Sequence, residues 1–255
     1  MSNVDAGSKG ETTSPFPEPV FREDLAELAK WHLRDHLDMP GEILYSSHKT
    51  LQPGDVYLIG FNPGGREGTC LGESIYSTLG RTNNAYCDEA WERDGKTLGK
   101  GTAPLQQRVR WLLTQLGKVP TAVCASNLIF MQSRKADEVR YPYLADRCWP
   151  IHKAILGIVK PKVIVAFGNS KRSAFEYLHH RLGKGKKIDK RASGHGQWKL
   201  KSFSTQLNGK DIRILGIPHL SRYSPDREEF YDWLPVKEEF NRWLLKDRKE
   251  VPIEA

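Results

Sequence analysis

The sequence lacks closely spaced cysteines and long hydrophobic runs. Its four cysteines, Cys70, Cys87, Cys124 and Cys148, include no C-x-x-C pair, and no histidine stands at zinc-finger spacing from them. Metal sites usually bring such pairs, so we expect reduced thiols and no metal. No apolar run approaches the roughly 20 residues of a membrane span, and residues 1–20 have no apolar signal-peptide core. These absences predict a cytoplasmic protein without a membrane partner, associated with the nucleoid if the cell is prokaryotic.

The charge balance is basic. Lys and Arg number 39 against 31 Asp and Glu, which gives a formal charge of +8, and the chain also carries seven Trp and nine Tyr. Cations and aromatic rings suit a nucleic-acid partner, although many proteins of this size are mildly basic and charge alone decides little. The length of 255 residues suits one domain. We place that domain at 21–248, between a polar arm at 1–20 and a charged tail at 249–255.

Apolar runs that alternate with helical patterns indicate an α/β protein. The runs expected to form buried strands are Val56–Ile59, Thr121–Phe130, Lys162–Phe167 and Ile212–Ile217. An alternating segment, Gly196–Ser204, is typical of an edge strand. Helices are expected over residues 21–33, Pro104–Leu116, Leu144–Val159, Lys171–Leu182 and Pro235–Leu245. The predicted fold is a single three-layer domain with a central, mostly parallel, four-stranded sheet flanked by helices.

The first strand runs into V-Y-L-I-G-F-N-P-G-G, residues 56 to 65. Pro63 fixes its own φ and keeps Asn62 out of the helical region, and Gly64 and Gly65 let a ligand approach the backbone. Ligands of open α/β sheets bind at the carboxyl ends of the strands. This stretch therefore predicts a reacting amide in a pocket, and the alternative is an ordinary Asn-Pro-Gly turn.

Two further strands end in polar residues, Asn127 and His219. Each of the two alone is more often structural. Because parallel strands end at one edge, Asn62, Asn127 and His219 together indicate a functional site.

Two loops remain open to more than one interpretation. The segment Arg66–Lys100 is long, dotted with glycine and polar, so it forms either one wall of the pocket or a surface insertion. The basic loop Gly183–Arg191 is either a phosphate contact or a solvated connector. The backbone contacts expected from these loops are Arg66, Lys184, Lys186 and Lys187.

The sequence resembles the uracil-DNA glycosylase superfamily over residues 56–224. G-F-N-P-G at 60–64 looks like the G-x-N-P-G motif of the mismatch-specific and single-strand-selective branches, and H-L-S-R-Y-S at 219–224 is similar to the family's H-P-S-P-L-S motif. S-N-L-I-F at 126–130 stands where the family places a base-reading Asn, and V-I-V-A-F-G-N at 163–169 resembles the strand between the motifs.

The resemblance implies a role for each motif residue. Asn62 would orient the attacking water, and His219 would donate a hydrogen bond to O2 of the departing base. Asn127 would read the base edge and Phe61 would stack on the base, with Gly64 and Gly65 beside it. The loop residues expected to clamp flanking phosphates or to enter the duplex are Ser221, Arg222, Tyr223 and Ser224.

Three departures from the family's pattern bear on substrate. The fast uracil-specific branch has an Asp where Asn62 stands, so an amide indicates a slower enzyme. It also has a Tyr after the motif's Pro, whereas Gly64 and Gly65 leave room here for a 5-substituted pyrimidine. Leu220 and Arg222 replace the two prolines of the last motif.

The sequence therefore predicts a monofunctional DNA glycosylase without a cofactor. It would flip out uracil or a 5-modified pyrimidine from duplex or single-stranded DNA, hydrolyse the N-glycosidic bond and leave an abasic site. No Lys occupies a Schiff-base position in the motifs. We expect a monomer that serves DNA repair, or antiviral defence if the substrate is a bulky modified cytosine of phage DNA. The alternatives are a non-catalytic nucleic-acid-binding module on the same fold and a hydrolase of free nucleosides.

Overall fold

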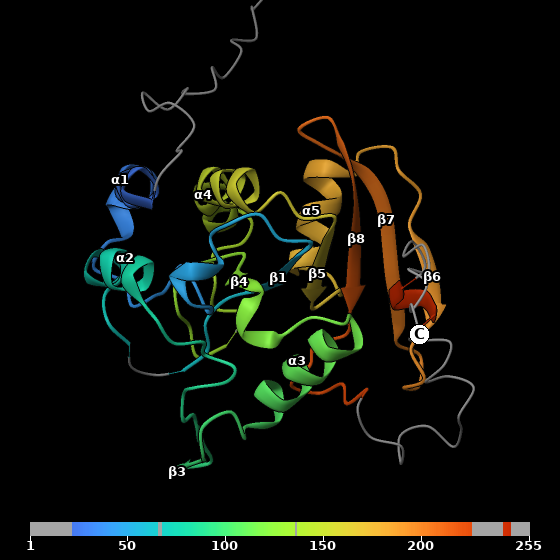
Figure 1. The fold of residues 1–255 in the computed structure, drawn as a ribbon, viewed down its shortest axis with the longest axis horizontal. Helices are drawn as coiled ribbons and strands as arrows, with labels where there is room; N and C mark the ends of the chain where they lie inside the picture. The colour runs from blue at the N-terminus through green and yellow to red at the C-terminus, as the bar shows by residue number, and fades with distance from the viewer. Residues whose placement is uncertain (1–21, 66–67, 136, 226–241, 246–255) are drawn as a thin grey trace, which may run out of the picture.

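The computed structural model, which describes residues 22–65, 68–135, 137–225 and 242–245, is an α/β structure around one six-stranded sheet (Figure 1). The strand order is β4-β1-β5-β8-β7-β6. Four strands are parallel: β4 (Cys124–Asn127), β1 (Val56–Gly60), β5 (Val163–Phe167) and β8 (Lys210–Ile217). The sheet is completed by two antiparallel strands, β7 (Lys199–Leu207) and β6 (Asp189–Ala192).

The four parallel strands lie where the apolar runs predict them. All five residues of β1 are buried, as are the last four of β5. A parallel strand is covered on both faces, so every position along it favours an apolar side chain. The mostly parallel sheet is confirmed.

The predicted count of four strands is wrong because β7 and β6 extend the sheet. β6 has the sequence D-K-R-A and is mostly exposed, so no apolar pattern marks it. Its backbone pairs with β7 from Asp189 opposite Ser202 to Ala192 opposite Lys199. An edge strand needs only these hydrogen bonds, and charged side chains are common on such edges.

Helices cover both faces of the sheet. On one face, the strand residues Tyr57, Ile59 and Ile164 share a buried cluster with side chains of four helices. These are α1 (Arg22–Leu33), α2 (Leu71–Gly80), α4 (Tyr143–Val159) and α5 (Ala174–Leu182). On the other face, Leu58 and Val165 pack with α3 (Pro104–Gln115) and with Trp243 and Leu244. The helices predicted before β1, before β4 and on either side of β5 are therefore present.

The segment that follows β1 contains α2 and a small hairpin, β2 (Glu92–Arg93) with β3 (Lys96–Thr97). Short 3-10 turns stand at Arg34–His36, His48–Thr50 and Pro120–Ala122. The four cysteines are free thiols, and Cys124 and Cys148 are buried.

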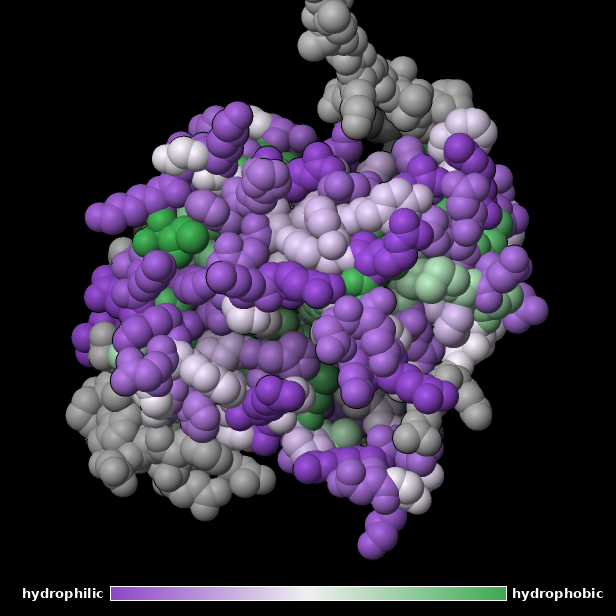
Figure 2. All heavy atoms as spheres, turned by 180° about the vertical axis from the view of Figure 1, so that it is seen from behind, coloured by the Kyte–Doolittle hydropathy of each residue, from purple (hydrophilic) through white to green (hydrophobic). Residues whose placement is uncertain are grey.

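The predicted arm at 1–20, the tail at 249–255 and most of the predicted helix at 235–245 lie outside the described residues. None of the described helices combines the length and the apolar character needed to cross a membrane. The face turned away in Figure 1 is mostly hydrophilic, and its hydrophobic residues show as small separate patches (Figure 2).

Candidate active site at the carboxyl edge of the sheet

Three strands bring the predicted polar residues to one edge of the sheet, here called the carboxyl edge. Gly60 at the end of β1 pairs with Asn127 at the end of β4, and Phe167 at the end of β5 pairs with Ile217 at the end of β8. β1 and β5 also run in register, because Ile59 pairs with Ala166. Asn62 and His219 each follow the end of their strand by two residues, so they leave the sheet at the same level.

Gly60 lets the side chains of neighbouring strands meet over it. A Cβ at this position would collide with Oδ1 of Asn127 and would lie 2.7 Å from Cζ of Phe167. The Phe167 ring in turn meets the His219 ring edge to face, with centroids 5.5 Å apart. Contacts therefore run from Asn127 to His219 along the α3 side of the edge, and Gly60 is required by this close approach.

The imidazole of His219 is held as one tautomer. The backbone N–H of Ser221 points to Nδ1 at 3.2 Å, and Oγ of Ser221 lies 2.7 Å from the same atom. Because an N–H can only donate, Nδ1 accepts and the proton of a neutral ring is on Nε2. Burial and the positive charge of Arg222 lower the pKa of His219 to about 4. At neutral pH the ring is therefore uncharged and offers an N–H donor.

The amide of Asn62 is also fixed in orientation. Its Nδ2 donates to the carbonyl of Pro63 and to Oγ of Ser133, both at 2.8 Å. Oδ1 accepts no hydrogen bond from any described residue. The amide nitrogen is therefore used by the protein, and the oxygen is the end that remains for a water or a ligand.

The loop after Asn62 is joined to the chain that follows β4. The backbone N–H of Ser133 donates to the carbonyl of Pro63 at 3.1 Å, and Nε2 of Gln132 donates to the carbonyl of Gly64 at 3.0 Å. Gly65 has a φ of +125°, which a residue with a side chain rarely adopts. These contacts between two loops hold Asn62 at the carboxyl edge.

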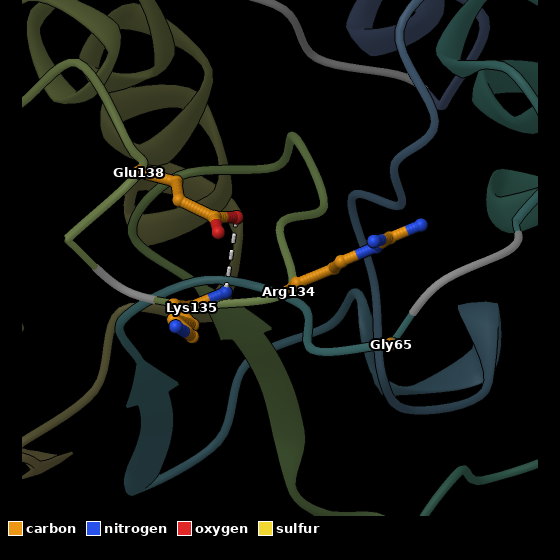
Figure 3. A pocket seen from close by; sticks show the side chains of 4 residues that line it. All are labelled: Gly65, Arg134, Lys135 and Glu138. Atoms are coloured by element: carbon orange, nitrogen blue, oxygen red, sulfur yellow. Dashed lines mark hydrogen bonds between the residues drawn. The ribbon is translucent and has the colours of Figure 1, made fainter.

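An open cavity of about 500 Å³ borders this loop (Figure 3). It is lined by Gly65, Arg134, Lys135 and Glu138. Glu138 turns its carboxylate to the backbone N–H of Lys135, with Oε2 3.3 Å from the nitrogen, while the side chain of Arg134 extends away from it. The cavity therefore offers both a carboxylate and cations. No heavy atom outside the neighbouring residues lies within 4 Å of a Cβ built on Gly64, so that side of the loop is open.

Asn127 is buried and only 4% exposed. Burial raises the pKa of the nearby Tyr45 phenol, and a polar contact with the Asn127 side chain acts in the opposite direction. A buried amide needs hydrogen-bond partners, and the Asn127 side chain lies over Gly60, since a Cβ built there would collide with its Oδ1.

Not every predicted site residue faces this edge. Phe61 is buried and packs on Tyr141 at 5.8 Å between centroids, among the residues under α1 and α4. Tyr223 is 1% exposed and its hydroxyl donates to the carbonyl of Ser193 at 2.7 Å, and Ser224 is buried as well. Beside His219, Ser221 and Arg222 are exposed.

The lysines predicted to contact DNA lie at the other end of the strands, away from the carboxyl edge. Lys184, Lys186 and Lys187 are exposed in the loop from α5 to β6. The carbonyl of Leu182, just before this loop, accepts a hydrogen bond from Thr205, which pairs with Ile212 near the start of β8. In Figure 1 the loop accordingly lies at the end of the sheet where β8 begins. Arg66 lies outside the described residues.

Sequence reasoning missed other cations that do lie at the carboxyl edge. Lys171 follows β5, and Lys199 begins β7. Asn169 joins these segments, since its Nδ2 donates to the carbonyls of Lys199 and Gly216 at 2.7 and 2.8 Å. The run G-H-G-Q-W before Lys199 was the available signal, because two glycines around a histidine, followed by a tryptophan, indicate a shaped loop.

Comparison with known proteins finds no matching family model and no matching curated protein. The interpretation of this site therefore rests on its geometry and on the motifs.

Proposed function

We propose that this protein is a monofunctional DNA glycosylase with a uracil-DNA glycosylase-like fold, and that it releases a flipped pyrimidine by hydrolysis. The observation that carries the proposal is His219, an uncharged imidazole whose Nδ1 is occupied by Ser221 and whose Nε2–H is left as a donor at the carboxyl edge. Asn127 ends β4 opposite Gly60, and Asn62 follows Gly60 by two residues, so the neighbouring strands β4 and β1 each supply an amide at this edge.

The chemistry needs fixed dipoles more than proton transfer. As the bond between C1′ and N1 breaks, its electron pair stays on the base and positive charge develops on the sugar. The Nε2–H of His219 would stabilise the negative charge at O2 of the base. Oδ1 of Asn62 would accept a hydrogen bond from the water whose oxygen adds to C1′, and that water releases a proton to solvent. Because an amide cannot take up this proton, we expect slow turnover.

Asn127 is the group that would read the base. Its amide presents one donor and one acceptor edge, and rotation of the amide suits either uracil or cytosine. The target nucleotide has to leave the duplex to reach this depth, because the residue is buried. Base identity is therefore set by more than Asn127.

One observation favours a bulky 5-substituted pyrimidine as substrate. The open side at Gly64 and the cavity of about 500 Å³ beyond Gly65 adjoin the loop that carries Asn62. Glu138 and Arg134 line that cavity and would bind the hydroxyl groups of a hydroxymethyl or sugar substituent. Release of such a base alone would point to defence against modified phage DNA.

The test is base release from labelled duplex and single-stranded DNA, with abasic sites then cleaved by alkali. The substrates carry uracil, mismatched thymine, 5-hydroxymethylcytosine or its glucosylated form. We expect release from at least one substrate, and about 100- to 1,000-fold slower release by His219→Ala, the cost of removing one transition-state donor. Asn62→Ala should also be slow, whereas His180→Ala, on the exposed side of α5, should match wild type.

Two results would contradict the proposal. Folded His219→Ala and Asn62→Ala variants that release bases as fast as wild type would remove the assigned roles. Tight DNA binding without release of any base would favour the non-catalytic binding module.

A further inference from the structure

The loop between β6 and β7, residues 193–198, has a defined shape. The N–H of Ser193 donates to the carbonyl of Trp198 at 3.2 Å, and the N–H of Trp198 donates to the carbonyl of His195 at 3.1 Å. Gly194 and Gly196 have φ values of +77° and +51°, which lets the backbone turn on both sides of His195. This loop therefore presents His195 and Trp198 in fixed positions.

The loop is attached to the candidate active site. The hydroxyl of Tyr223 donates to the carbonyl of Ser193 at 2.7 Å, and the ring of Tyr223 lies 6.4 Å from that of His195. The backbone N–H of Tyr223 donates in turn to the carbonyl of His219 at 3.0 Å. A short chain of contacts thus connects the imidazole of His219 to the 193–198 loop.

The ring of Trp198 differs from the other exposed aromatic rings of the described residues. Trp31, Tyr76 and Tyr143 each have a cation over the ring, Arg34, Lys30 and Arg140 respectively. Trp198 is 38% exposed and pairs with His195 at 4.5 Å between centroids, with no cation over it among the described residues. An indole supported on one side and open to solvent is a surface on which another flat ring can stack.

Cations follow Trp198 and lie on the neighbouring loops of the same edge. Lys199 follows Trp198 directly, and Lys171 and Arg222 are exposed on the neighbouring loops of the carboxyl edge. None of these three cations forms an ion pair within the described residues. Cations that attract phosphate beside an open aromatic ring are the two elements of single-strand nucleic-acid binding.

We propose that Trp198, supported by His195, is a stacking platform for an unpaired nucleobase next to the flipped-out nucleotide. The inference rests on the proposed function, since it places the DNA strand across the carboxyl edge. The ligand class is a base of single-stranded or locally opened DNA, held by stacking instead of by a base-specific hydrogen bond.

The test is fluorescence anisotropy with the full chain and a short labelled single-stranded oligonucleotide, at low and at moderate salt. Trp198→Ala should bind about tenfold more weakly, because stacking on one base contributes on this scale. The loss should be the same at both salt concentrations, since stacking releases no counterions. Trp198→Phe should recover most of the affinity, and Trp31→Ala, an exposed tryptophan on α1 at the other end of the sheet, should bind like wild type (Figure 1).

The outcomes separate this inference from the proposed function. Wild-type affinity in Trp198→Ala would overturn the stacking platform, and the ring would then serve another contact, such as one with a protein partner. This result would not affect the proposed glycosylase activity. Wild-type binding without base release would overturn the glycosylase and keep the platform. A wild-type chain that does not bind the oligonucleotide would overturn the platform, whereas the glycosylase would still be decided by base release from duplex DNA.

Discussion

At the scale of single residues, two histidines have similar pKa values and different hydrogen-bond partners. The pKa values of His152 and His219 are both lowered to about 4, in each case chiefly by burial. In His152 both nitrogens are used, Nδ1 with the Tyr57 hydroxyl at 3.0 Å and Nε2 with the carbonyl of Leu128 at 3.1 Å. In His219 only Nδ1 is used by described residues. His152 therefore supports the core, and His219 keeps a donor for a ligand.

The low pKa of His219 predicts the pH dependence of base release. A ring that is uncharged down to about pH 4 keeps the same hydrogen-bonding state from pH 5 to pH 8. The single-turnover rate should therefore show no acidic limb near pH 6.5, the ordinary value for histidine. A rate that falls tenfold per pH unit below 6.5, and loses that dependence in His219→Ala, would contradict this assignment.

His152 predicts the pH dependence of stability. Its pKa is about 4 in the folded protein and near 6.5 when unfolded, so the unfolded state takes up the proton first. The stabilisation is complete above pH 6.5 and is lost as pH falls towards 4, which amounts to about 2 kcal/mol between pH 7 and pH 5. In urea unfolding, His152→Gln should remove that part of the pH dependence. His180→Gln, at an exposed site, should retain it.

At the scale of elements, the buried strands were predictable, the alternating segment Gly196–Ser204 indicated much of β7, and the edge strand β6 was missed. The run Lys162–Phe167 is apolar because both faces of β5 are covered, and such a requirement is visible in the sequence. β6 consists of mostly exposed and mostly charged residues that pair through their backbone, so no apolar pattern marks it in the sequence. The same limit applies to Phe61 and Tyr223. An aromatic ring in a loop that follows a strand suits a pocket or the core equally well, and only the packing partners decide.

The segment 68–100 depends on Arg81, at the end of α2. Nη1 of Arg81 donates to Oε1 of Glu42 at 2.5 Å and to the carbonyl of Leu44 at 2.6 Å, and Nη2 pairs with Glu89. The Arg81 side chain is 11% exposed, and the side chains of Glu42 and Glu89 are about a third exposed. This arginine therefore joins the segment after α2 to the chain before β1.

Arg81→Met should destabilise the fold by about 2–3 kcal/mol. The loss arises because Glu42 and Glu89 are each left without their cation. It is smaller than the loss for a fully buried ion pair because both glutamates keep some contact with water. Urea unfolding at neutral pH measures the change. The matched variant is Arg93→Met in the β2–β3 hairpin, where the side chain is 60% exposed and pairs with Asp94, and its effect should stay within about 0.5 kcal/mol. Equal effects of the two variants would show that Arg81 does not anchor the segment.

At the scale of the whole molecule, the two ends of the sheet carry separate groups of cations. The lysines of the 183–187 loop stand at the end where β8 begins, and Lys171, Lys199 and Arg222 stand at the carboxyl edge. The sequence shows the first group as a conspicuous run and scatters the second over three loops. Only the sheet topology brings the scattered cations together, so a sequence pattern reveals the first group and not the second.

This separation predicts which cations contact DNA. We expect the affinity for single-stranded DNA to stay within about twofold of wild type when Lys184→Ala, Lys186→Ala and Lys187→Ala are combined, apart from a small long-range effect of net charge.

A matched variant removes the same number of charges from the carboxyl edge by combining Lys171→Ala, Lys199→Ala and Arg222→Ala. If each cation meets a phosphate of the single strand, this variant should bind far more weakly, and the slope of log affinity against log salt should become shallower by about two. The two triple variants have the same net charge. A similar loss of affinity in both would therefore mean that DNA binding responds to total charge. A loss confined to the variant of the 183–187 loop would place the DNA at the end of the sheet where β8 begins.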